Sequence, residues 1–209
     1  PRPLLLQAPS PRARMGFAME PSPSRSVFRW RRAFVVLLLL GATLGAALDG
    51  IHTHFGATRY ANPLVLRMAW WVPLLFGGAF CIGLLRPVLD LRLRGEPSSR
   101  PTLAQTVLGM ALFVLAYFLT VVPLPWPLVS ALLAAIFLFG WWRCDGSRVG
   151  LMIALGAAIG GPLFELFLIL NGAFLHLHVA YLHLPGWLPF LYLCAAVGLT
   201  TLARFLVAA

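Results

Sequence analysis

The chain has 209 residues, of which 60% are hydrophobic and 11% charged. Soluble domains carry about a quarter charged residues, so this composition excludes an ordinary soluble protein and indicates a membrane protein. The net charge of +10 is compatible with nucleic-acid binding, but the sixteen arginines gather near the N-terminus and between hydrophobic runs. That placement is typical of membrane topology signals, and we expect no nucleic-acid partner.

The first 27 residues are rich in proline, serine and arginine. This composition is typical of a disordered tail, or of a processing segment that is not part of the fold. We therefore expect a tail over 1–27 and one folded domain over 28–209.

Uncharged runs predict the helices, because about 20 helical residues are needed to cross a bilayer. The predicted spans are 33–48, 68–85, 103–122, 128–142, 149–170 and 187–207. The proline-rich "PLPWP", 123–127, predicts a tight hairpin between the third and fourth spans, because proline cannot continue a helix. The segment 171–186 begins with Asn-Gly and ends with Pro-Gly, which predicts an interfacial loop with an amphipathic piece.

Arginine placement predicts the orientation. With the N-terminus inside, fourteen arginines lie on inside segments and two, Arg59 and Arg67, on outside segments. Positively charged loops stay on the cytoplasmic side, and this bias requires an even number of spans. The expected fold is all-α, a polytopic bundle of six transmembrane helices with both termini cytoplasmic.

Glu165 is the one charged residue between Arg148 and Arg204. A carboxylate facing lipid costs several kcal/mol, so we expect it to face the bundle interior. Pro162 is expected to kink the same helix, which suggests a polar spot in an internal cavity. Packing against a neighbouring helix explains Glu165 equally well.

All five histidines fall on the predicted outer half, namely His52, His54, His176, His178 and His183. Together with Asp49 they suggest two alternatives, a small transporter or channel that uses Glu165 and these histidines, or a metal-dependent membrane enzyme. No metal-ligand spacing, activated nucleophile or phosphate loop supports the second alternative. We therefore expect no catalytic residue, metal or cofactor.

The connection "WWRCDGSRVG" lies on the predicted cytoplasmic side. Its simplest interpretation is anchoring: Trp141 and Trp142 lie at the headgroups, Arg143 and Arg148 hold the topology, and Asp145 caps the next helix. A binding surface is the alternative, because short polar connections between rigid helices often carry function.

Several stretches of the chain resemble the insulin-induced gene (Insig) family of membrane proteins. They are "AWWVPLLFGGAFCIGLLRPVLDLRLRGEP", "FGWWRCDGSRVGL", "FLILNG" and "GWLPFLYLCAAVGLTTLARFL", in this order. The resemblance covers about residues 33–207. It implies a non-enzymatic regulator of the endoplasmic reticulum, or of the inner or plasma membrane in a bacterium.

The same resemblance implies a ligand and partners. Family members bind oxysterols among their helices and hold Scap and other sterol-sensing membrane proteins. We therefore expect a sterol or diacylglycerol-like lipid as ligand and, in a eukaryote, sterol-sensing-domain proteins as partners. The resemblance places partner contacts at Asp145, with Trp141, Trp142 and Arg148 beside it. Polarity and depth suggest Phe113, Tyr117, Glu165 and Asn171 as lipid-binding residues.

Overall fold

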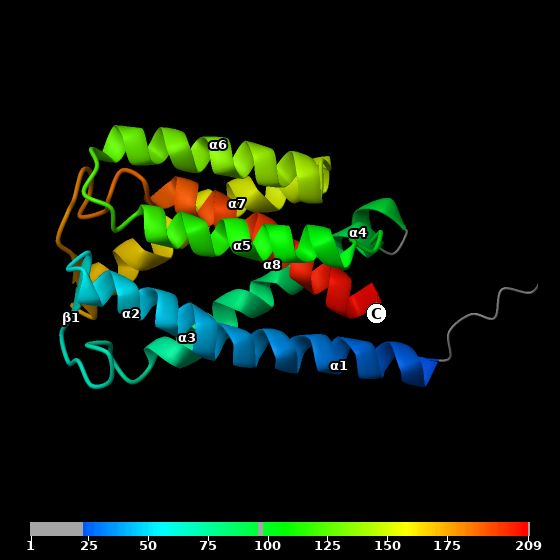
Figure 1. Ribbon diagram of the computed structural model, residues 1–209. Helices are drawn as coiled ribbons and strands as arrows, with labels where there is room; N and C mark the ends of the chain where they lie inside the picture. The colour runs from blue at the N-terminus through cyan, green and yellow to red at the C-terminus, as the bar shows by residue number, and fades with distance from the viewer. Residues whose placement is uncertain (1–22, 96–97, 209) are drawn as a thin grey trace, which may run out of the picture.

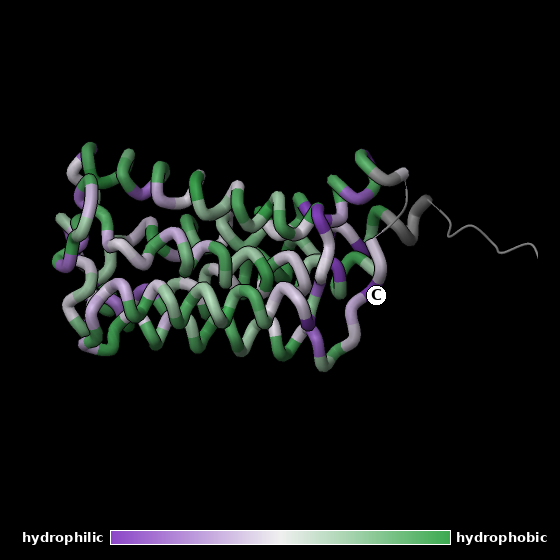
Figure 2. The backbone as a smooth tube through the Cα atoms, turned by 90° about the horizontal axis from the view of Figure 1, so that it is seen from above, coloured by the Kyte–Doolittle hydropathy of each residue, from purple (hydrophilic) through white to green (hydrophobic). Residues whose placement is uncertain are grey.

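The computed structural model describes residues 23–95 and 98–208. Of the predicted tail, residues 1–22 lie outside this part, and the helix of the first span already begins at Pro23. Six helical rods run side by side (Figure 1), as predicted. Hydrophilic positions gather mainly toward the two ends of the bundle (Figure 2), as expected of a protein that crosses a membrane.

The first two rods each contain an irregular turn. The first is α1 (Pro23–Leu40), the π-helical segment η1 (Gly41–Gly45) and α2 (Ala46–His54). The second is α3 (Val72–Cys81), the 3-10 segment η2 (Ile82–Leu84) and α4 (Leu85–Arg94). The second rod is longer than predicted. Pro87 lies in the first turn of α4, where its missing N–H costs no helical bond, and Gly95 in the left-handed conformation ends the helix.

The remaining rods are α5 (Leu103–Leu119), α6 (Trp126–Cys144), α7 (Arg148–Leu170) and α8 (Leu188–Ala208). Pro125 and Pro127 flank the start of α6, so the hairpin lies where the proline-rich segment predicted it. A capping box between Thr102 and Gln105 fixes the start of α5. Five of the rods are long and apolar enough to span a membrane, and α5 is a shorter apolar helix.

The outer connections differ from the prediction. Strands β1 (Thr58–Tyr60) and β2 (Phe174–His176) pair in an antiparallel two-stranded sheet, with Arg59 opposite Leu175. The predicted loop over 171–186 therefore contains a strand. The sheet lies at one end of the bundle, and the start of α1 and the C-terminus lie at the other (Figure 1).

The helix α8 forms the centre of the bundle. It packs against α1, α4, α5, α6 and α7, and most of its residues are buried. The helix α3 packs against α1 and η1, whereas α7 packs against α8. Residues of α3 and α7 line one internal cavity, which is described below.

The orientation predicts opposite labelling of two surface positions. Arg59 in β1 and Arg148 at the start of α7 are both exposed, and they lie at opposite ends of the bundle. A membrane-impermeant maleimide added to intact cells should label Arg59→Cys and leave Arg148→Cys unlabelled until the membrane is opened. Labelling of both variants from one side would contradict the three spans expected between these two positions.

Candidate functional site

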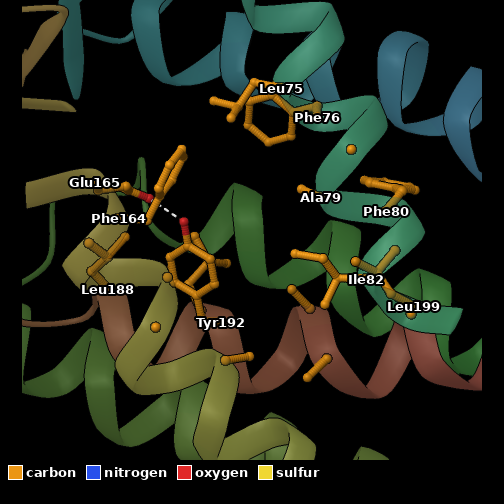
Figure 3. A pocket seen from close by; sticks show the side chains of 18 of the residues that line it. Leu75, Phe76, Ala79, Phe80, Ile82, Phe164, Glu165, Leu188, Tyr192 and Leu199 are labelled. Atoms are coloured by element: carbon orange, nitrogen blue, oxygen red, sulfur yellow. Dashed lines mark hydrogen bonds between the residues drawn. The ribbon is translucent and has the colours of Figure 1, made fainter. Parts of the chain in front are cut away.

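A cavity of about 830 Å³ lies inside the bundle, between α3 and α7 and beside α8. This volume is within the range of pockets that hold small ligands. Figure 3 shows Phe76 and Phe80 on one wall and Phe164, Glu165 and Tyr192 on the other. Apolar residues form most of the wall, so the space suits an oily guest.

The cavity opens sideways, toward the surrounding lipid. Leu74 and Ile82 on the second rod and Met152 and Phe164 on α7 line it, and each of these side chains is at least 46% exposed. Large exposed apolar side chains on a membrane-spanning helix face hydrocarbon. The opening between α3 and α7 therefore faces the hydrocarbon of the bilayer.

Glu165 lies at the outer end of the cavity, where two side chains hold it. His176 Nε2 lies 2.7 Å from Glu165 Oε2, and the Tyr192 hydroxyl donates a hydrogen bond of 2.7 Å to Oε1 (Figure 3). The carboxyl is 18% exposed and lines the cavity. The expectation that Glu165 faces the bundle interior is therefore confirmed in position.

A second carboxyl, Asp49, lies at the same end. The Tyr60 hydroxyl donates a hydrogen bond of 2.8 Å to Asp49 Oδ2, and both residues are buried and line the cavity. Burial and the neighbouring carboxyl raise the pKa of Tyr60 above its usual range, so this hydroxyl keeps its proton and remains a donor.

The outer histidines separate into two groups. His52 and His176 line the cavity, and His52 Nε2 lies 2.7 Å from Thr120 Oγ1. His54, His178 and His183 are exposed. Within residues 23–95 and 98–208, no three histidine, cysteine, aspartate or glutamate side chains lie close enough to hold a metal ion.

The predicted lipid-binding residues fall in different places. Phe113, Tyr117 and Glu165 line the cavity, and Phe113 and Tyr117 meet edge to face at 5.3 Å. Asn171 is not among the lining residues: it is exposed at the end of α7, where its amide bonds the carbonyl of Phe167. Sequence reasoning missed Tyr60 and Tyr192 as partners of the carboxyls, because neither stands near its acid in sequence.

The predicted partner-binding residues also separate. Trp142 is 68% exposed and Arg148 is exposed, whereas Trp141 is half-buried and its indole N–H bonds the carbonyl of Ser147. The side chain of Asp145 is buried, 3% exposed. Its predicted role as a helix cap is wrong, because Ser147 caps α7 by accepting a bond from the Gly150 N–H.

Asp145 instead joins a buried cluster of four charged side chains. Arg86 pairs with Asp145 and, at 2.9 Å, with Asp90, while Arg204 Nη1 lies 3.5 Å from Asp145 Oδ1. Arg204 also donates a hydrogen bond of 2.7 Å to the carbonyl of Cys144. The cluster connects α4, the α6–α7 connection and α8. The opposite charges of Arg86 and Asp90 at a spacing of four could have been read from the sequence.

No protein-family profile matches the sequence, but individual known proteins are similar to it over most of its length. The insulin-induced gene 1 protein of Gallus gallus is 30% identical over 215 residues, which cover 95% of this chain and 82% of the relative. The human insulin-induced gene 1 protein is 28% identical over 213 residues, covering 94% and 75%.

Two solved structures have the same architecture. The mycobacterial Insig homolog MvINS from Mycobacterium vanbaalenii superimposes with a TM-score of 0.70 at 30% identity, covering 84% of this chain and 94% of that chain. A cross-linked MvINS trimer gives a TM-score of 0.73 at 29% identity over the same shares.

Proposed function

This chain belongs to the insulin-induced gene (Insig) family, a family of integral membrane regulators of the sterol pathway, and on that premise we propose that it binds a sterol-like or diacylglycerol-like lipid in the cavity between α3 and α7. The proposed role is regulatory and non-enzymatic: the bound lipid alters how the bundle associates with other membrane proteins. The cavity, apolar along its length and polar at its outer end, carries the proposal.

The position of the cavity suggests how bound lipid is coupled to the association with other membrane proteins. Leu85 and Leu89 of α4 line it, and the same helix carries Asp90, which pairs with Arg86 in the buried charge cluster. A ligand that spreads or draws together α3–α4 and α7 therefore acts on the cluster that holds the α6–α7 connection. A ligand shifts an association only by its difference in affinity for the bound and free forms.

We further propose that the exposed part of this connection contacts the partner. Trp142 and Arg148 are the accessible members of the predicted set, and the Arg143 guanidinium lies over the Trp142 ring at 5.6 Å. Exposed tryptophan and arginine are the side chains that most often anchor protein interfaces. In a eukaryote, the partners would be sterol-sensing-domain membrane proteins.

Filling the cavity tests lipid binding. Gly156 lines it, and a Cβ added there would meet nothing within 4 Å, so Gly156→Phe should occupy the space without disturbing the walls. A lipid present at about a hundredfold over its Kd stabilises the folded state by about 2.7 kcal/mol. The melting temperature of the wild-type protein should therefore rise when sterols or dioleoylglycerol are added, and that of Gly156→Phe should not.

Ile159→Phe is the matched control, because Ile159 is 65% exposed on the same helix and is not among the residues that line the cavity. This variant should respond to lipid like the wild-type protein. An unchanged lipid response in Gly156→Phe would contradict binding in this cavity.

A further inference from the structure

The two outer connections have the same backbone at an offset of 116 residues. Gly56 and Gly172 have φ of 73° and 70°, and three-residue strands begin two residues later, at Thr58 and Phe174. Each connection then has a tight turn with two successive left-handed residues that are not glycine, Leu66–Arg67 in one and Leu182–His183 in the other. The following helices begin at the same offset, at Val72 and Leu188.

The hydrogen bonds between the two connections follow the same offset, because the donor and acceptor of one bond lie 116 residues from those of the other. Ala61 N–H donates to the Ala173 carbonyl at 3.2 Å, and Leu177 N–H donates to the Ala57 carbonyl at 3.0 Å. The strand pairing is centred on Arg59 opposite Leu175, again 116 residues apart. The α2–β1–α3 unit and the α7–β2–α8 unit are therefore related by an approximate two-fold axis. The sequence keeps traces of the relation in the identical pairs Trp71 and Trp187, Pro73 and Pro189, and Leu75 and Leu191.

The same relation connects the two carboxyls of the cavity. Asp49 and Glu165 are 116 residues apart, and each is bonded to the third residue of its own unit's strand, Tyr60 or His176. A close approach of helices repeats as well. A Cβ on Gly45 would lie 2.9 Å from the Phe76 side chain, and one on Gly161 would lie 2.2 Å from the Tyr192 ring. The repeat thus brings two acid–strand pairs to one end of the cavity.

Two polar atoms at this end lack a hydrogen-bond partner among the described residues, Thr58 Oγ1 and His176 Nδ1. Thr58 and His176 are 5% and 7% exposed, stand opposite each other in the sheet and both line the cavity. Leaving a buried polar group unpaired costs about 1 to 3 kcal/mol, so such groups in a cavity wall indicate a polar group of a ligand.

The charge of this end limits the chemistry of the ligand. Two carboxyls line it, the described lining residues include no arginine, and the chain contains no lysine. A phosphate would meet like charge in a desolvated site whose described lining offers no arginine or lysine to pair with it. A hydroxyl fits, because it donates to a carboxylate oxygen and accepts a bond from a hydroxyl such as that of Thr58.

We propose that the outer end of the cavity is a head-group site, built jointly by the two repeated units, that binds the free hydroxyl of an uncharged lipid and excludes phosphate-bearing lipids. This inference rests on the proposed binding of lipid in the cavity. The lipid would lie with its head at the sheet and its apolar part along α3 and α7 toward α4.

Three lipids with the same two oleoyl chains test the site, namely dioleoylglycerol, its 3-acetyl ester and dioleoyl phosphatidic acid. Thermal unfolding of the purified full chain measures their binding. Dioleoylglycerol should raise the melting temperature most, the acetyl ester less because it has no hydroxyl to donate, and phosphatidic acid not at all. The preference for the free hydroxyl over the ester should be about tenfold in Kd, equivalent to one hydrogen bond to a charged group.

Variants separate the head-group site from the cavity as a whole. Thr58→Val keeps both carboxyls and suits a strand, and it should reduce the preference for the free hydroxyl while dioleoylglycerol still binds. Asp49→Asn and Glu165→Gln remove negative charge, so the two substitutions together should permit phosphatidic acid to bind. Equal stabilisation of the wild-type protein by all three lipids would overturn the head-group site and leave lipid binding intact. No stabilisation by any of the three or by sterols would overturn the proposed function itself.

Discussion

Asp145→Ala is expected to lower the free energy of unfolding by about 3–5 kcal/mol, because it leaves buried arginine charge without its partner. Arg86 and Arg204 both lie against this carboxyl, their side chains are 2% and 4% exposed, and Asp90 alone would remain to balance them. Unfolding in mixed detergent micelles, followed by far-UV circular dichroism, measures the change. A loss below about 1 kcal/mol would contradict a structural role for the cluster.

A charge-balanced variant shows whether the loss of stability comes from the pairing of Asp145 with arginine. Asp145→Leu combined with Arg204→Leu removes one charge of each sign and leaves the pair between Arg86 and Asp90 at 2.9 Å. The double variant should be less destabilised than the sum of the two single variants, as expected for side chains in one network. Additive losses would mean that the two residues act independently.

The proposed partner contact depends on Asp145 and on Trp142 in different ways. Because Asp145 is buried, we expect its substitution to weaken partner binding by displacing the α6–α7 connection. Trp142→Ala removes an exposed side chain and should weaken partner binding without a loss of stability. Comparing the two variants in one co-purification assay distinguishes support of the surface from direct contact.

Gly161→Ala is the second substitution with a large expected effect. Its Cβ would lie 2.2 Å from the Tyr192 ring, which itself donates a hydrogen bond to Glu165. The ring must move, so we expect a loss of about 1–3 kcal/mol from overpacking, together with loss of this hydrogen bond. The melting temperature should fall, and the response to added lipid should weaken because the wall of the cavity shifts.

The neighbouring glycine provides the control. A Cβ on Gly160 would meet nothing within 4 Å, although this residue also lines the cavity. Gly160→Ala should leave stability unchanged or raise it by up to about 1 kcal/mol, since alanine is the better helix former. Equal effects of the two substitutions would contradict the close approach of α7 and α8 at Gly161.

The six rods could be predicted from the sequence because the signals there are local. Uncharged runs indicate the number of helices and the prolines of 123–127 indicate one hairpin, whereas the orientation from arginine placement stays a prediction. The interior position of Glu165 could be predicted because a carboxylate that faces lipid costs several kcal/mol. The family resemblance, now confirmed, joined these elements into one fold.

The sheet and the charge cluster could not be predicted in the same way, because they depend on contacts between residues that are far apart in sequence. "TRY" and "FLH" are too short to indicate strands, and each is completed only by the other. Asp145 stands two residues before Ser147, so a local interpretation as a helix cap was reasonable. Its real partners, Arg86 and Arg204, are 59 residues away in each direction.

The central position of α8 has a consequence for biogenesis. The helices α1, α4, α5, α6 and α7 all pack against it, yet it follows every one of them along the chain. During synthesis the earlier helices must therefore wait in the bilayer without their common centre, exposed to chaperones and proteases. Complete assembly therefore requires α8 to leave the translocon, so substitutions that disrupt α8 should lower the amount of folded protein in the membrane more than comparable substitutions in α6.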